Sequence, residues 1–402
     1  MISGKIHQMT KRLILLIMLL SFPSVSLAYS VLDYFGDKTG PIISSDFNTG
    51  RPHRGDVRIP FMIKDDGTSV KKVAVYLDAM DVTNDVFFGD DHYKNSYAFN
   101  SEKMPDGKHT FTIVADDSSK KMNRSVQELT FNIDNTAPLL TLASGGGMFA
   151  QGKTAYLYFS SSEPNIEIEG TFQAKEIRAY PYQNRYRAVI GFSIDDPGNE
   201  NYFLRVKARD LAGNISDYHY KVYMKKTKFG MLSFTLKPKN MEMLMPDVIR
   251  ADWKKIEDVV SRENNDKYYH GKFITPTAGR ISMTFGLNEV INGAESGKHR
   301  GLDFANAAGT SIVASNSGIV RLSEYLPAHG NTVVIDHGQG IYTYYAHMKK
   351  LLVMSGTGVK KGQAIGLMGA TGVATGPHLH FAVSLHNLRV DPAQWLQGVV
   401  ID

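Results

Sequence analysis

The sequence of 402 residues contains no cysteine. This absence excludes disulfide bonds, thiol nucleophiles, cysteine-based zinc sites and a lipidated N-terminal cysteine. Any metal site must therefore be built from histidine, aspartate or glutamate side chains. Long apolar runs are also scarce, and the run Leu13–Leu20 is too short to span a bilayer comfortably as a helix. No basic-aromatic patch or recognition motif is present, so nucleic acid is not expected as a partner.

The composition is that of folded globular material, with 43% hydrophobic and 21% charged residues. A chain of this length predicts two to four domains. Charge is uneven: residues 29–220 hold 21 Lys+Arg and 26 Asp+Glu, whereas residues 221–402 hold 21 and 14. Six lysines and no acid lie between 221 and 239. A solvated hinge explains these lysines, and attraction to an anionic polymer or surface is the alternative.

Residues 1–28 are predicted to be a signal peptide, and the rest of the chain to be exported to the periplasm or cell envelope, or secreted. Lys5, Lys11 and Arg12 precede the apolar run, and Ser26-Leu-Ala28 supplies small residues for cleavage. An uncleaved anchor is the alternative. No stable membrane span is expected once the signal is removed.

Two tandem β-sandwiches are predicted, one at residues 41–138 and the other at residues 139–225. Short alternating stretches such as Val57–Ile63 and Arg185–Ile194 are separated by turn residues, a pattern typical of half-buried strands. Ala115 and Ala208 occupy similar places before a turn and a last strand, 93 residues apart, which suits a repeated sandwich. Residues 226–270 then predict a basic connector and a helix from Pro246, with apolar residues at helical spacing.

Residues 271–402 form the last predicted domain, which is again β-rich. Seven of the 13 histidines lie between His299 and His386. His378 and His380 are two apart, so on a strand both imidazoles face the same side. On its own such a pair is a weak signal, and most pairs of this kind carry no chemistry. The further clusters at His299–Asp303 and Tyr344–His347 supply the ligand types that zinc prefers.

Three sequence patterns in this domain resemble the lysostaphin-type zinc metallopeptidases, which cut peptide cross-links of bacterial peptidoglycan. They are His299-x-x-x-Asp303, Tyr345-Ala-His347 and His378-x-His380, within roughly 271–395. Further stretches in the family's order are Phe285-Gly286, Gly301–Ala305, Ala308–Thr310, Ile335–Gly338, Val359–Gly366 and Thr371-Gly372. Asp134–Pro138 and Ala208–Asn214 similarly resemble the junction and late-strand signatures of bacterial immunoglobulin-like modules. The expected fold is therefore mainly β: two tandem immunoglobulin-like β-sandwiches, a short helical linker and a C-terminal antiparallel peptidase domain.

The resemblance implies one Zn²⁺ per catalytic domain, held by His299, Asp303 and His380, with His347 and His378 as the catalytic histidines. Three protein ligands leave a fourth position open for water, as in catalytic zinc sites. His378 is then the expected general base, and His347 would orient the water or stabilise the oxyanion. The two roles could be exchanged. Asn288, Ala374 and Ala382 depart from the family's usual residues, but none is a ligand.

The predicted function is an exported zinc endopeptidase that acts on peptidoglycan peptides. The alternatives are a catalytically silent regulator of wall amidases, which would lack some of the five residues, and an adhesin-like wall-binding protein. The immunoglobulin-like modules could serve as spacers, could bind sugars through their tyrosines, or could cover the cleft of the peptidase.

Overall fold

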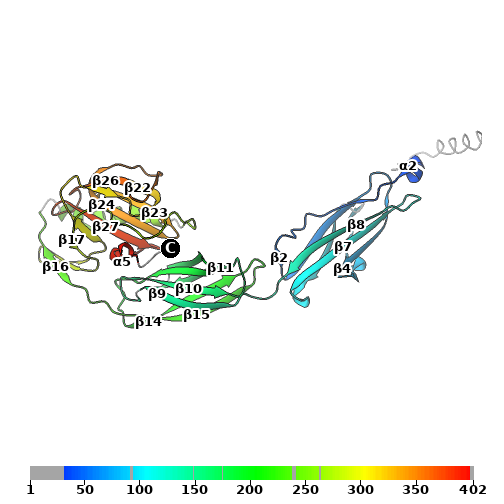
Figure 1. The fold of residues 1–402 in the computed structure, drawn as a ribbon, viewed down its shortest axis with the longest axis horizontal. Helices are drawn as coiled ribbons and strands as arrows, with labels where there is room; N and C mark the ends of the chain where they lie inside the picture. Colours follow the sequence, from blue (N-terminus) through cyan, green and yellow to red (C-terminus); the bar gives the residue numbers. More distant parts are fainter. Residues whose placement is uncertain are drawn as a thin grey trace, which may run out of the picture. The chain divides into compact units, whose positions relative to one another are not determined.

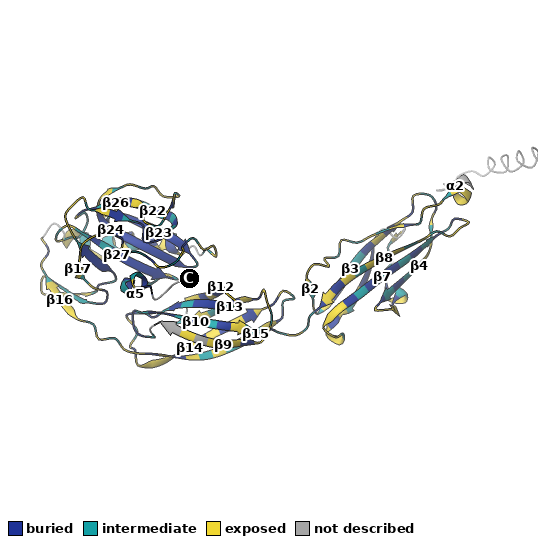
Figure 2. Ribbon diagram, viewed as in Figure 1, coloured by how far each residue is buried: buried dark blue, intermediate teal, exposed yellow. Residues whose placement is uncertain are grey.

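The computed structural model describes residues 31–90, 94–147, 149–173, 175–237, 241–261 and 264–398 (Figures 1 and 2). The predicted signal peptide, residues 1–28, lies outside the described residues. In the described part, no helix is both long enough and apolar enough to cross a membrane. The chain divides into two compact units between Thr136 and Ala137, with Leu211–Asn214 grouped with the first unit.

The first unit is a β-sandwich made of a three-stranded and a five-stranded sheet. One sheet holds β1 (Ile42–Ser44), β3 (Asp56–Lys64) and β6 (Asn95–Asn100), and the other holds β2 (Pro52–His53), β8 (Arg124–Ile133), β7 (Gly107–Asp117), β4 (Val70–Leu77) and β5 (Met80–Asp81). Along β3, Val57, Ile59, Phe61 and Ile63 are buried while their neighbours are more exposed. These side chains meet those of β4, β7 and β8 in one core. The helix α2 (Val31–Gly36) precedes the sandwich, and the short 3-10 turns Thr83–Asp85 and Ser101–Lys103 lie within it.

The second module begins the second unit and is one continuous seven-stranded antiparallel sheet. Its order is β15 (Ile215–Met224), β14 (Glu200–Arg209), β11 (Glu167–Phe172), β12 (Lys175–Tyr182), β13 (Arg185–Gly191), β10 (Thr154–Ser161) and β9 (Leu140–Gly147). The rings of Phe159 in β10 and Tyr220 in β15 lie 5.8 Å apart. The sheet therefore folds over a single core, with strands far apart in its order facing each other.

The C-terminal domain contains a ten-stranded antiparallel sheet. Its main path is β17 (Arg280–Met283), β20 (Leu302–Ala305), β27 (His378–Leu385), β24 (Ile341–Leu351), β23 (Gly330–Gly338), β22 (Gly318–Leu326) and β25 (Gly358–Val359), and β21 (Ser311–Val313), β26 (Ala364–Met368) and β28 (Leu388–Val390) pair beside it. These assignments confirm the mainly β fold with an antiparallel C-terminal domain. The individual domain boundaries stay predictions.

The two faces of this sheet are buried differently because side chains alternate along each strand. In β27, Leu379, Phe381, Val383 and Leu385 join the main core, which also includes Trp395 of α5 (Pro392–Leu396). The opposite face carries Ala382, which joins a second cluster under the helix α4 (Pro246–Val260). Trp253, Ile256, Val259 and Val260 of α4 belong to that cluster, so the predicted apolar stripe packs on the peptidase domain.

The connector also contributes a strand to the C-terminal domain. β16 (Met231–Phe234) pairs in parallel with β18 (Asn288–Ile291), which pairs with β19 (Ala294–Lys298). The 3-10 turn Glu242–Leu244 precedes α4. The basic connector is therefore partly built into the domain that follows it.

Candidate metal centre

Asp303 and His380 lie directly opposite each other on neighbouring strands. β20 and β27 are antiparallel, and their register pairs Asp303 with His380 and Ala305 with His378. Side chains of directly paired residues project from the same face of a sheet. His380 Nδ1 and Asp303 Oδ1 are consequently 2.9 Å apart.

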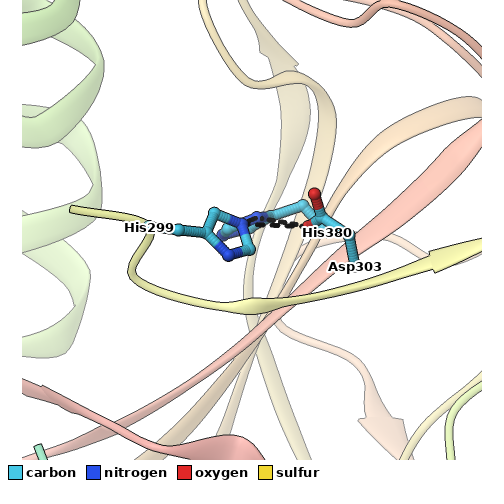
Figure 3. A group of neighbouring side chains, drawn as sticks. All are labelled: His299, Asp303 and His380. Carbon is cyan, nitrogen blue, oxygen red and sulfur yellow. Dashed lines mark hydrogen bonds and ion pairs between the residues drawn. The ribbon is translucent and has the colours of Figure 1, made fainter. Parts of the chain in front are cut away.

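His299 reaches the same point from the segment before β20 (Figure 3). Its backbone N–H donates to the carbonyl of Leu287, and its carbonyl accepts from Gly286, which fixes the segment. Its Nε2 lies 3.0 Å from His380 Nδ1 and 3.1 Å from Asp303 Oδ1. Its Nδ1 lies 3.0 Å from the carbonyl oxygen of Thr284. Because that carbonyl can only accept, Nδ1 carries the proton and Nε2 presents a lone pair.

The chemistry of these three residues fits a metal ion. Two imidazole nitrogens and a carboxylate oxygen lie mutually 2.9–3.1 Å apart. In a tetrahedral zinc site with bonds of about 2.0–2.2 Å, neighbouring ligand atoms are roughly 3.3 Å apart. The Thr284 carbonyl supplies the outer hydrogen bond that commonly orients a metal-bound histidine. We therefore describe His299, Asp303 and His380 as the candidate metal centre.

His378 and His347 lie beside this centre. His378 Nδ1 is 2.8 Å from the Gly376 carbonyl, and its Nε2 is 3.8 Å from Asp303 Oδ2. His347 Nδ1 is 2.8 Å from the Thr371 carbonyl, and its ring centroid is 4.7 Å from that of His378. In both rings the carbonyl fixes the proton on Nδ1 of the neutral form and leaves Nε2 as an acceptor.

His347 points to this face because of a bulge in β24. Opposite β23, the residues Ala346 and His347 together face Thr332 alone, and His347 has a φ of +60°. A bulge re-aims a side chain that would otherwise point to the other face. Histidine is among the non-glycine residues enriched at positive φ, which lowers the strain of this backbone.

Burial and charge set the protonation of the centre before a metal is bound. Burial alone would raise the pKa of Asp303, but hydrogen bonds with His299 and His380 outweigh it and hold the pKa far below its usual range. Burial lowers the pKa of His380 to about 4. It also lowers the pKa of His347, an effect that the neighbouring His378 and His380 reinforce. Burial opposes charge on His299 too, but Asp303 outweighs it and raises that pKa. His347 and His380 are therefore neutral at pH 7.

The centre opens into a cleft of about 620 Å³. One part of its wall is the centre itself with His347 and His378. Another part comes from the connector, through Leu232 and Phe234 of β16 and through Ile249 and Trp253 of α4. The connector thus helps to shape the space around the five predicted residues.

Several ionisable residues in the cleft were not expected from the sequence. Glu289 lines it, and burial, with a smaller effect of Asp303, raises its pKa. Arg389 and His329 also line it. His329 Nδ1 lies 2.9 Å from Asp252 Oδ2 of α4. No local sequence pattern predicts this contact between distant segments. His337 is fully buried, and its two ring nitrogens are hydrogen-bonded to the Ser317 carbonyl and the Thr343 hydroxyl.

Two protein-family models match this chain. Residues 297–392 match Peptidase family M23, and residues 93–157 match a bacterial Ig-like domain of group 3, a segment that crosses the predicted boundary at 138. Both matches support the resemblances drawn from the sequence.

Curated relatives match a limited part of the chain. Peptidoglycan DD-endopeptidase ShyA of Vibrio cholerae is 48% identical over 93 residues, which are 23% of this chain and 22% of that protein. An uncharacterized metalloprotease of Buchnera aphidicola is 40% identical over 114 residues, which are 28% of this chain and 30% of that protein. The chain thus spans less than a third of the length of these relatives.

Solved structures give two further similarities. A peptidase M23 from Pseudomonas aeruginosa is 27% identical, with a TM-score of 0.48, and the match covers 62% of this chain and 96% of that one. The catalytic domain of the antimicrobial peptidase lysostaphin from Staphylococcus simulans is 32% identical, with a TM-score of 0.28. That match covers 30% of this chain and 92% of the lysostaphin domain.

Proposed function

We propose that this chain, which carries a peptidase family M23 domain at its C-terminus and a bacterial Ig-like domain before it, is an exported zinc-dependent endopeptidase that hydrolyses peptide cross-links of peptidoglycan. The observation that carries the proposal is the convergence of His299, Asp303 and His380 within 2.9–3.1 Å of one another. Two further histidines with free acceptor nitrogens stand beside that group. This arrangement supports a catalytic site more than a structural one.

His299, Asp303 and His380 would hold the metal, one ion per domain. When bound, zinc would lower the pKa of a water molecule to about 7 and polarise the carbonyl that is attacked. The buried Asp303 stays ionised because its pKa is depressed, so it supplies the negative charge of the ligand set. The neutral state of His380 at pH 7 leaves its Nδ1 lone pair available for the metal.

His378 is the better candidate for the general base. Its Nε2 is an acceptor and lies 3.8 Å from Asp303 Oδ2, so a proton gained at Nε2 would be stabilised by that carboxylate. The depressed pKa of His347 disfavours a charged ring there. His347 would instead accept a hydrogen bond from the attacking water and orient it. An oxyanion-donor role for His347 is less suitable, because the hydrogen of its neutral ring is held by Thr371.

Export and the wall substrate rest on other observations. The predicted signal peptide at 1–28 would direct the chain out of the cytoplasm. Peptidoglycan lies outside the cytoplasm, so export would bring the chain to its substrate. The relative ShyA is named as a peptidoglycan DD-endopeptidase, which supports a cross-link as the substrate. A silent regulator is less well supported, because all five metal and catalytic positions are filled and converge.

Digestion of purified peptidoglycan tests the proposal. The full chain should release cross-link-derived peptides that mass spectrometry identifies, a chelator should abolish the release, and added zinc should restore it. His219, whose side chain is 65% exposed and outside the site, provides the control variant His219→Ala, which should cleave normally. If the zinc-loaded chain leaves the cross-links intact, the enzyme proposal is wrong, and binding to the wall would then be the function to measure.

A further inference from the structure

Arg389 lies on the same face of the sheet as the candidate metal centre. β28 pairs with β27 so that Arg389 is opposite Ser384, and Ser384 is four residues beyond His380. An even separation along a strand keeps side chains on one face. Arg389 also lines the same cleft as His299, Asp303 and His380.

Two aromatic rings hold the Arg389 side chain in place. Its guanidinium carbon lies 3.3 Å from the ring centroid of Tyr344 and 4.8 Å from that of Trp253. Tyr344 is paired with Ala382 of β27. Ala382 is two residues from His380, a separation of about 7 Å along the strand. The guanidinium is thus directed back toward the centre. Contacts with ring faces leave the N–H groups at its edge available for hydrogen bonds.

Among the described residues, no acid neutralises the guanidinium of Arg389. Within the described part of the chain, no carboxylate lies at ion-pair or hydrogen-bonding distance from Arg389. Besides burial, the positive charge of Arg300 lowers the pKa of Arg389. Arg300, which also lines the cleft, is by contrast paired with Asp195 at 2.8 Å. Burial lowers the pKa of Arg389, the direction expected for a partly buried cation that lacks an anion.

The cleft around Arg389 favours an anion. Arg280, Lys298 and Arg300 line it as well, against the acids Glu289 and Asp303. An arginine that is held flat and unpaired binds a carboxylate in a bidentate manner better than other side chains do. The ring of Tyr344 that holds Arg389 belongs to a residue paired with Ala382, two positions along β27 from His380, so a carboxylate bound there would lie within a few residues of the bond that is cut.

We propose that Arg389 is the specificity-determining residue of the cleft and binds a free carboxylate close to the scissile bond. The inference rests on the proposed endopeptidase function. The matching substrate is a cross-link to a diamino acid whose acylated amine sits on a carbon that also bears a carboxylate. A glycine bridge has no such group, and a cross-link through the side-chain amine of lysine has no carboxylate on that carbon. Arg389 therefore selects the first kind of cross-link.

A pair of synthetic cross-linked peptides tests this inference with the full, zinc-loaded chain. The peptides differ only in carrying a carboxylate or a carboxamide on the carbon next to the scissile nitrogen. A charged hydrogen-bonded contact of this kind predicts about a 10- to 100-fold higher kcat/KM for the carboxylate peptide. Equal rates on the two peptides would overturn the inference. If neither peptide is cut, the proposed function itself fails, so the two failures are distinguishable.

Variants then assign the preference to Arg389. Arg389→Gln should lose activity on the carboxylate peptide, mainly through KM, and should cut both peptides at similar rates. Arg389→Lys should recover part of the preference, because it restores the charge without the planar fork. Zinc content and thermal unfolding of each variant show whether the site and fold are intact. Arg250→Gln, on the outer side of α4 with a 78% exposed side chain, is the control that keeps the full preference. A preference that persists in a folded Arg389→Gln would also refute the assignment.

Discussion

Asp252 joins the helix α4 to the loop that supports His347. Its Oδ2 accepts hydrogen bonds from the backbone N–H of Ala328 at 2.8 Å and of His329 at 3.3 Å, and it contacts His329 Nδ1 at 2.9 Å. Asp252 is 1% exposed. The carbonyl of His329 in turn accepts the backbone N–H of His347 at 2.9 Å. Replacement of Asp252 by alanine should therefore affect both stability and catalysis.

The expected loss of stability follows from the partners that would be left behind. Removal of one member of a buried, hydrogen-bonded pair costs about 3–5 kcal/mol. For a unit of this size, that corresponds to a fall in melting temperature of roughly 6–20 °C. Catalysis should fall about 10- to 100-fold, because a small displacement of His347 misplaces the attacking water. Zinc content should not change, since Asp252 contacts no candidate ligand.

Thermal unfolding, zinc analysis and peptidoglycan cleavage of Asp252→Ala measure these three quantities. Hydrogen bonds hold the pKa of Asp252 below its ordinary value against the opposing effect of burial. A depressed carboxyl pKa stabilises the fold above the unfolded-state value of about 3.9 and loses that effect as the pH falls through the lower folded-state value. The part of the stability gap between the wild type and the variant that comes from ionised Asp252 should thus be lost as the pH falls below about 4. Asp258→Asn, on the same helix but exposed and paired with Lys254, should change stability by about 0.5 kcal/mol or less. If Asp252→Ala unfolds like this control and cleaves at the wild-type rate, the proposed link from α4 to His347 is wrong.

Three further changes probe the centre itself. His380→Ala should lose both zinc and activity, whereas His378→Ala should keep zinc and lose turnover; full activity in either variant would contradict the role assignment. The pKa of metal-free His299 is raised above 6.5, so zinc must displace a proton from its ring. The zinc affinity measured by chelator competition should therefore already weaken as the pH falls from 8 toward 6. A zinc affinity that is constant over this range would contradict the raised pKa of His299. A Cβ at Gly301 would lie 2.4 Å from His380 Cε1, so Gly301→Ala should weaken zinc binding at least about tenfold by displacing that ligand, whereas Gly358→Ala, which meets nothing within 4 Å, should not.

The strand positions of the centre could be predicted from the sequence because they depend on local periodicity. The two-residue spacing of His378 and His380 predicts that both rings share a face, and the structure places both on the side of β27 opposite Leu379 and Phe381. The alternation in Val57–Ile63 likewise appears as the buried pattern of β3. These patterns are short-range, so each segment carries its own evidence.

The direction of His347 could not be predicted in the same way. In a regular strand His347 would point with Tyr345 toward the main core, where the Tyr345 ring lies 5.4 Å from Phe381. The positive φ and the bulge reverse it. Neither glycine nor a turn signal marks this position in the sequence, so only the family resemblance pointed to His347.

The contribution of the connector to the cleft depends on contacts between distant segments. Met231–Phe234 lies in a lysine-rich stretch that the sequence suggested as a hinge, yet it pairs with β18, which is more than fifty residues later. Similarly, the apolar stripe of α4 predicts burial but does not identify the surface on which the helix packs. Pairing and docking of this kind have no local signature.

The proposed selectivity depends on a larger part of this chain than the proposed chemistry does. The five residues proposed to bind metal and to catalyse all lie within the segment 297–392 that matches the peptidase family. Trp253, which contacts Arg389, and Phe234 of β16 lie outside that segment and still line the cleft. Relatives that share only the matched segment can therefore have the same reactive centre but a different wall around it. The choice of cross-link should then follow the connector, because α4 supplies one of the two rings that hold Arg389 toward the centre.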